Sequence, residues 1–276
     1  MKPIKITRLL TGTLFREGAG VKLHRYIGAD KNNDWEPILL FDYFDSHEAI
    51  DFMAGFPAHP HRGFETITYL LQGSITHEDN HGHKGTIGAG DVQWMTAGKG
   101  VIHSEMPDPA SNRLHGLQMW FNLPAAEKMR EPRYQERQCK ELPVERHENG
   151  VCIKVIAGKT DKGTLSPVIE IATQPLFLDI HMPEGTKVQQ HIPVGYQSIL
   201  FVVSGRVSVG GEKIIAGLLA GLTSGEVLSI SALETSQCLL IAAAKLNESI
   251  TRYGPFVMNT QEEVMQALDD FRNGLF

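Results

Sequence analysis

The sequence has 276 residues, of which 42% are hydrophobic and 21% charged, so it can bury one or two cores that need no disulfide framework. Its formal net charge of −6 excludes the strongly basic surface of a general nucleic-acid-binding protein. The longest purely apolar run, Leu239–Ala244, is far shorter than the about 20 residues that a membrane-spanning helix needs.

Short apolar runs, rich in β-branched and aromatic residues and bounded by Gly, Pro or Asn, predict strands through most of the chain. The predicted strands are Phe64–Leu71, Gly73–His77, Asp91–Met95, His115–Phe121, Val151–Ile156, Leu176–His181, Ser198–Val203, Arg206–Val209 and Gln237–Ala243. This spacing is typical of sandwiches and small barrels rather than of βαβ units. We therefore expect an all-β protein.

The segment 122–150 separates two strand-rich halves. It is rich in charged residues and contains Pro124, Pro132 and Pro143, so we interpret it as a linker or a surface crossover. A short helical stretch is expected within it, around Ala125–Met129.

The clearest helix is predicted near the C-terminal end of the sequence. Thr260–Glu263 has the pattern of a capping box, in which a threonine side chain and a glutamate three residues later satisfy the first backbone amides. Val264, Leu268 and Phe271 follow at helical spacing, and Gly274 marks the end.

The two halves resemble each other in sequence pattern. Tyr69–Ile75 and Phe201–Val207 share one order of apolar residues, a polar residue and a glycine, at an offset of 132 residues. Gly90–Val92 and Gly225–Val227 match in the same order at an offset of 135. These matches indicate duplication of one β-domain.

Two short motifs carry the residues with the clearest chemistry. His59 and His61 flank Pro60, which favours an extended backbone for the residue before it. His103 and Glu105 have the same spacing. Because side chains two residues apart in a strand point to the same face, each pair projects together. Adjacent strands would bring three imidazoles and one carboxylate to one point.

This donor set suits a borderline divalent metal such as Fe, Ni, Cu, Mn or Zn. Four protein ligands leave two octahedral positions open, as a catalytic or ligand-binding metal requires. Glu65 has the same strand parity as His59 and His61 and offers three alternatives. It could replace Glu105 as a ligand, hold an imidazole by an outer-shell hydrogen bond, or form a salt bridge with Arg62 or another basic residue.

Other histidines fit a metal site less well. His81 and His83 lie in a polar turn that we interpret as a solvated hairpin tip. In the second half, the repeat offset places His191 opposite His59, but Pro193 and Gln197 occupy the places of His61 and Glu65. We therefore predict a single metal, held in the N-terminal half.

These motifs resemble those of the pirin family of the cupin superfamily. The resemblance lies in FPAHPHRGFETITYLLQGSITHEDNHG, GDVQWMTAGKGVIHSEMP and LHGLQMWFNLP, and the ending YGPFVMNTQEE…NGLF is also similar. It implies a bicupin, with an N-terminal metal-binding barrel in residues 1–130 and a metal-free cupin-like barrel in residues 131–276 that ends in a helix.

The resemblance also implies a cofactor and an activity. Family members often bind iron, which makes Fe(II) the expected metal, and the ligands carried over are His59, His61, His103 and Glu105. Some members resemble quercetin 2,3-dioxygenases, which implies a small aromatic substrate and dioxygen as reactants. Others are described as transcriptional co-regulators in eukaryotes.

A flavonol would bind an open metal position through its 3-oxygen, and the metal would lower the pKa of that hydroxyl. Glu105 is the expected general base, because the imidazoles use their lone pairs on the metal. Apolar side chains beside the motifs could line a slot for the planar rings: Phe56, which we favour, and Trp94, Met95, Met119 and Trp120.

The sequence also allows two other classes of function. A metal-dependent, redox-sensing regulatory protein would bind a protein partner rather than nucleic acid, because the chain is acidic. A cupin isomerase or sugar-binding protein is the third alternative.

Cysteine usage and the first residues bear on the compartment. Cys139, Cys152 and Cys238 are odd in number and show no CxxC spacing, so we expect neither a disulfide framework nor a thiolate metal site. Thr7 and Arg8 interrupt the first apolar residues, so we expect no secretory signal. A cytoplasmic location is expected, or a nuclear one in a eukaryote.

Overall fold

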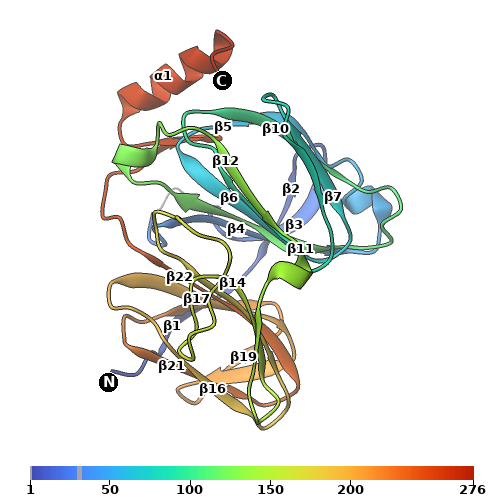
Figure 1. Ribbon diagram of the computed structural model, residues 1–276, viewed down its shortest axis with the longest axis vertical. Helices are drawn as coiled ribbons and strands as arrows, with labels where there is room; N and C mark the ends of the chain where they lie inside the picture. The colour runs from blue at the N-terminus through green and yellow to red at the C-terminus, as the bar shows by residue number, and fades with distance from the viewer. Residues whose placement is uncertain (1, 30–32) are drawn as a thin grey trace. The chain divides into compact units, whose positions relative to one another are not determined.

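In the computed structural model, which describes residues 2–29 and 33–276, the chain forms two compact units (Figure 1). The unit that we call the N-terminal barrel consists of Thr13–Cys139 and Leu246–Phe276. The C-terminal barrel consists of Met1–Gly12 and Lys140–Lys245. Each contains one seven-stranded and one four-stranded antiparallel sheet. The prediction of an all-β protein with two similar domains is confirmed.

The seven-stranded sheet of the N-terminal barrel has the order β12-β9-β6-β11-β4-β3-β2. Its strands are β2 (Thr13–Glu17), β3 (Val21–Ile27), β4 (Ile38–Ser46), β6 (Phe64–Gln72), β9 (Val92–Thr96), β11 (Leu114–Asn122) and β12 (Arg133–Arg137). The four-stranded sheet has the order β5-β10-β7-β8, with β5 (Phe56–His61), β7 (Ile75–Asp79), β8 (Lys84–Ile87) and β10 (Val101–Pro107). A short 3₁₀ helix, η1 (Ala49–Asp51), precedes β5.

The C-terminal barrel repeats this arrangement. Its larger sheet has the order β1-β20-β17-β22-β15-β14-β13, with β1 (Ile6–Thr11), β13 (Val144–Arg146), β14 (Cys152–Ala157), β15 (Leu176–Met182), β17 (Tyr196–Ser204), β20 (Leu218–Leu222) and β22 (Ser236–Ala244). The smaller sheet, β16-β21-β18-β19, contains β16 (Lys187–His191), β18 (Arg206–Val209), β19 (Glu212–Ile215) and β21 (Val227–Ala232). Its interior is a continuous apolar core.

The observed units differ from the expected division into 1–130 and 131–276 at both ends of the chain. Strand β1 pairs with β20 and so completes the larger sheet of the C-terminal barrel. The last residues return to the N-terminal barrel through the hairpin β23 (Thr251–Tyr253) and β24 (Phe256–Met258). Backbone pairing at a sheet edge places β1. Burial of Phe256, Val257 and Met258 places the C-terminal hairpin, with Val257 packed in one cluster with Leu39 and Phe64.

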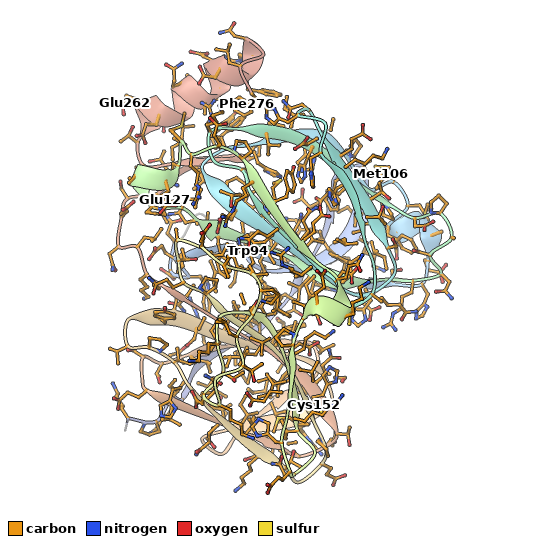
Figure 2. All side chains as sticks on the ribbon, in the orientation of Figure 1. Trp94, Met106, Glu127, Cys152, Glu262 and Phe276 are labelled. Atoms are coloured by element: carbon orange, nitrogen blue, oxygen red, sulfur yellow. The ribbon has the colours of Figure 1, made fainter. Side chains whose placement is uncertain are left out.

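Helix α1 (Gln261–Arg272) is the predicted C-terminal helix. The capping box is present: Thr260 Oγ1 accepts from the Glu263 amide at 3.2 Å, and Glu263 Oε2 accepts from the Thr260 amide at 3.0 Å. Arg62 Nη1 donates to Asp270 Oδ2 at 2.6 Å, and the Arg62 guanidinium lies 4.2 Å from the ring centre of Phe276. The helix is thereby joined to the end of β5 in the same unit (Figures 1 and 2).

The segment 122–150 is more structured than a linker. It contains the 3₁₀ helices η2 (Ala125–Glu127) and η3 (Cys139–Glu141), so the helix expected around Ala125–Met129 is a single 3₁₀ turn. Its strand β12 pairs with β9 of the N-terminal barrel, and β13 pairs with β14 of the C-terminal barrel. Each barrel therefore takes an edge strand from this segment.

The structure bears on the cysteines and on membrane-spanning helices. Cys139, Cys152 and Cys238 form no disulfide with one another in the structure. Within residues 2–29 and 33–276, the structure contains no helix with the length and apolar character needed to cross a membrane.

Candidate metal centre

Strands β5 and β10 bring the two sequence motifs together. They pair antiparallel, with His103 opposite His59 and Val101 opposite His61. The turn after β5 requires Gly63, whose φ is +86° and where a Cβ would lie 2.0 Å from the Val257 carbonyl oxygen. This tight turn lets β5 end at His61 and β6 begin at Phe64.

The imidazoles of His59, His61 and His103 form one cluster. Their ring centres are 4.5 Å apart for His59 and His103, 4.7 Å for His59 and His61, and 5.0 Å for His61 and His103. One ring nitrogen from each lies within 4.8 Å of the others, so one ion could be held by all three. The spacing argument predicted this convergence.

The hydrogen bonding of these rings leaves lone pairs for a metal. His59 Nδ1 donates to the Pro57 carbonyl oxygen at 2.8 Å, so its Nε2 carries the lone pair. His61 and His103 are buried, and within the described residues their ring nitrogens have no hydrogen-bond partner. Such unsatisfied buried nitrogens are costly unless a ligand occupies them. The residues present therefore fit a transition metal.

Burial keeps the imidazoles of His61 and His103 neutral. It holds the pKa of His61 well below its usual range, with further lowering from the neighbouring His103 and His59. It also lowers the pKa of His103 to about 4, although Glu105 opposes the shift. A neutral imidazole is the form that coordinates a metal.

Glu105 is buried beside the cluster but is not part of it. Its Oε1 accepts from Thr68 Oγ1 at 3.2 Å, and its Oε2 accepts from Gln118 Nε2 at 2.9 Å. The pairing of β10 with β5 shifts register between His103 and Glu105, which lies opposite Phe56. The structure thus groups three of the four predicted ligands and holds the carboxylate next to them.

Glu65 occupies a different place from all three alternatives considered above. Its carboxylate is fully buried and accepts from Trp94 Nε1 at 3.0 Å and from Thr96 Oγ1 at 2.7 Å. It does not belong to the histidine cluster, and Arg62 pairs with Asp270 instead. The assignment of Glu65 as an outer-shell partner of an imidazole is therefore corrected: it fixes an indole within the barrel.

Glu65 should make folding stability depend on pH. Burial raises the pKa of its carboxyl from 4.5 to about 7, although the hydrogen bonds from Thr96 and Trp94 oppose the shift. Because the folded pKa is the higher one, this contribution to stability is complete below pH 4.5 and is lost as the pH rises through 7. The expected loss is about 3 kcal/mol. We expect Glu65→Gln to gain that much stability relative to the unmodified protein between pH 5 and 8.

Urea unfolding of both proteins across this pH range measures the difference. A difference that does not change with pH would show that Glu65 does not titrate in this window.

A cavity of about 370 Å³ opens beside His59 and His61. Its walls combine aromatic, polar and charged side chains: Phe56 and Trp120, Gln118, the acidic Glu17 and Asp42, and the basic Arg25 and Arg252. Trp120 lies over the cluster, with its ring centre 5.3 Å from that of His61. The cavity therefore joins a candidate metal position to a space that is partly aromatic and partly charged.

The set of predicted pocket residues has to be corrected. Phe56 lines the cavity, but Trp94, Met95 and Met119 are fully buried and do not line it. Figure 2 shows Trp94 within the N-terminal barrel, where its indole is bound by Glu65. On β11, Met119 and Trp120 point to opposite faces because side chains alternate along a strand, so only Trp120 reaches the cavity.

Sequence reasoning missed the charged residues of the cavity. Arg252 comes from β23, and its guanidinium lies 4.6 Å from the ring centre of Trp120. Arg25 of β3 donates to both carboxylate oxygens of Asp42 on β4, at 2.8 and 2.7 Å. No sequence motif marks these positions. Arg252 only precedes the C-terminal segment, beginning at Tyr253, whose resemblance to the pirin family was noted above.

The C-terminal barrel lacks the histidine cluster. His191 lies at the end of β16 with an exposed side chain, and its Nδ1 is 2.7 Å from Asp161 Oδ2. Within the described parts of the chain, every group of three metal-ligating side chains that converges on one point belongs to the N-terminal barrel.

Comparisons with known proteins bear on this site. The family model described as Pirin matches residues 20–121, and the model described as Pirin C-terminal cupin domain matches residues 177–276. The chain is 41% identical to a pirin-like protein of Caulobacter vibrioides, over 98% of each chain. It is 42% identical to pirin of Homo sapiens, over 98% of this chain and 92% of that one.

A solved structure is similar over the same length. The crystal structure of quercetin 2,3-dioxygenase from Acinetobacter baumannii matches with a TM-score of 0.89 at 33% sequence identity. The match covers 99% of this chain and 98% of that chain. Similarity therefore extends over both barrels.

Proposed function

Because the chain belongs to the pirin family of bicupins, we propose that it is a metal-dependent dioxygenase that cleaves a flavonol such as quercetin. The observation that carries the proposal is the convergence of three imidazoles, of which His59 and His61 line the aromatic-walled cavity and His61 and His103 are buried without hydrogen-bond partners among the described residues. The similarity to a quercetin 2,3-dioxygenase along nearly the whole chain supports the substrate class.

His59, His61 and His103 would hold one divalent metal, with Glu105 as the fourth ligand. Fe(II) is the metal we propose, and Ni, Cu, Mn or Zn would also suit these donors. When bound, the metal would acidify the 3-hydroxyl of the flavonol and bring dioxygen to the reacting ring. Both oxygen atoms enter the opened product, and one ring carbon leaves as carbon monoxide.

Glu105 is the group best placed to receive the proton of the 3-hydroxyl. The imidazoles would donate their lone pairs to the metal and could not also act as bases. Thr68 and Gln118 each donate a hydrogen bond to the Glu105 carboxylate, which keeps it oriented next to His103. This support holds the base in one position before substrate arrives.

The cavity walls fit a planar anion. Phe56 and Trp120 offer apolar surface for flat rings, and Trp120 lies against His61, so the rings would lie beside the metal. Arg252 places a positive charge over Trp120, where it would stabilise the flavonolate formed by loss of the proton.

An aerobic assay with quercetin tests the function. Protein loaded with Fe(II) without oxygen should, on admission of dioxygen, consume one dioxygen for each quercetin lost and release carbon monoxide. The flavonol absorption band should disappear at the same rate, and metal-stripped protein should be silent. Equal rates with and without metal, or no loss of quercetin, would end the proposal.

A further inference from the structure

We propose that His77, His83 and Glu136 form a second divalent-metal site in the N-terminal barrel, of the kind that binds zinc. The three residues come from β7, from the turn just before β8, and from β12. One ligand atom from each lies within 4.8 Å of the others. None of them belongs to the histidine cluster, and the inference does not depend on the proposed function.

The two imidazoles converge on one carboxylate. His77 Nε2 lies 2.5 Å and His83 Nε2 lies 3.0 Å from Glu136 Oε1. Ligands around a tetrahedral zinc ion lie about 3.4 Å apart, given metal–ligand distances of about 2.1 Å. An ion would therefore enter the group through shifts of about an ångström in the partly exposed side chains of Glu136 and His83.

His77 is a buried polar group whose hydrogen bonding is incomplete. Its side chain is 2% exposed, and its Nδ1 finds no partner in the part of the chain that the structure describes. Glu136 Oε1 is crowded, because Gln93 Nε2 also donates to it at 3.1 Å. The other carboxylate oxygen of Glu136, Oε2, lies next to the backbone of Gly85 in β8.

The side chains of His77 and Glu136 pack directly against the backbone of Gly85. Gly85 pairs with His77 across the β7–β8 hairpin, and a Cβ built on it would lie 2.6 Å from Glu136 Oε2 and 2.7 Å from His77 Nε2. Its φ lies outside the left-handed region, so the backbone itself does not call for glycine. The missing side chain lets His77 Nε2 and Glu136 Oε2 lie together against the Gly85 backbone, where both could hold one cation.

The remaining features suit an exchangeable ion. His83 is 39% exposed, so the group can be reached from solvent, and Tyr134 stacks on its ring at 4.1 Å and 19°. Two imidazole nitrogens and one carboxylate, with water as the fourth ligand, form a ligand set that zinc uses in proteins. The sequence had suggested a solvated hairpin tip for His81 and His83, but the structure brings His83 to His77 and leaves His81 exposed.

Zinc titration of metal-stripped full-length protein tests the site. The titration should be made in the His59→Ala/His61→Ala double variant, called the background variant, because it lacks two imidazoles of the first cluster. Calorimetry should show one remaining zinc ion per chain. Adding Glu136→Gln or His83→Ala should weaken its binding at least about 100-fold. Thermal unfolding of the apo-proteins checks that each variant is folded.

His81→Ala is the matched control, because His81 lies in the same turn and is exposed. It should leave the affinity unchanged. Gly85→Ala should also abolish binding, by filling the space beside His77 and Glu136.

Three results would overturn the proposal: no zinc bound in the background variant, unchanged affinity in Glu136→Gln, or equal losses in His81→Ala and His83→Ala, which would indicate chelation by the surface histidine pair. These experiments measure the number of zinc ions bound and the affinity for zinc. Their outcome is therefore independent of whether the protein turns over quercetin.

Discussion

We expect His59→Ala to remove one bound metal ion per chain and to abolish metal-dependent loss of quercetin. His59 contributes a lone pair on Nε2, because its Nδ1 is committed to the Pro57 carbonyl oxygen. Losing one of three imidazoles should weaken metal binding at least about 100-fold. The side chain is only half-buried at the edge strand β5, so folding stability should change by less than about 1 kcal/mol.

Iron content after dialysis, measured in the His83→Ala background, isolates the loss at this cluster. His191→Ala is the control, because His191 occupies the place of His59 in the second barrel and is bound to Asp161. It should retain iron and turnover. Full iron occupancy in His59→Ala would show that this imidazole is not a ligand.

The second large effect we expect is that Glu105→Gln, assayed at saturating iron, keeps the metal on the three imidazoles but loses turnover. The amide has the same shape and can keep a hydrogen bond to Thr68 or Gln118, but it cannot accept the proton of the 3-hydroxyl. General-base catalysis contributes about 10²- to 10⁴-fold, so kcat at saturating iron should fall by that factor.

Glu65→Gln separates this effect from any loss of a buried carboxylate. Glu65 lies in the same barrel, but it binds Trp94 and Thr96 rather than facing the cluster. Its kcat should stay within about twofold of the unmodified enzyme. Equal turnover in Glu105→Gln and the unmodified enzyme would remove Glu105 from the mechanism.

The strands were predictable where a short apolar run is bounded by turn residues. Every predicted strand matches an observed one to within two residues at each end, and several of them, such as β6, β9, β15 and β22, are buried on both faces, which requires such runs. The sequence did not predict that residues 1–12 belong to the C-terminal barrel and residues 246–276 to the N-terminal barrel. Strand β1 is largely exposed, so backbone pairing with β20, rather than side-chain burial, determines where it lies.

The candidate ligands were predictable for a similar reason. The i, i+2 spacing of His59 and His61 fixes their shared face, and the antiparallel pairing of β5 with β10 then adds His103. Nearness in sequence to the histidine motifs did not predict which side chains line the cavity, because Trp94 and Met119 face the barrel core. Arg252 reaches Trp120 through tertiary contact from a distant segment, which local patterns do not encode.

Anomalous diffraction at the iron edge from crystals of the iron-loaded protein tests the central claim most directly. The account predicts one strong peak within about 2.3 Å of a ring nitrogen from each of His59, His61 and His103, with a Glu105 oxygen completing the protein ligands. The absence of a peak among these three imidazoles, or an ion there that fewer than three of them contact, would contradict the account.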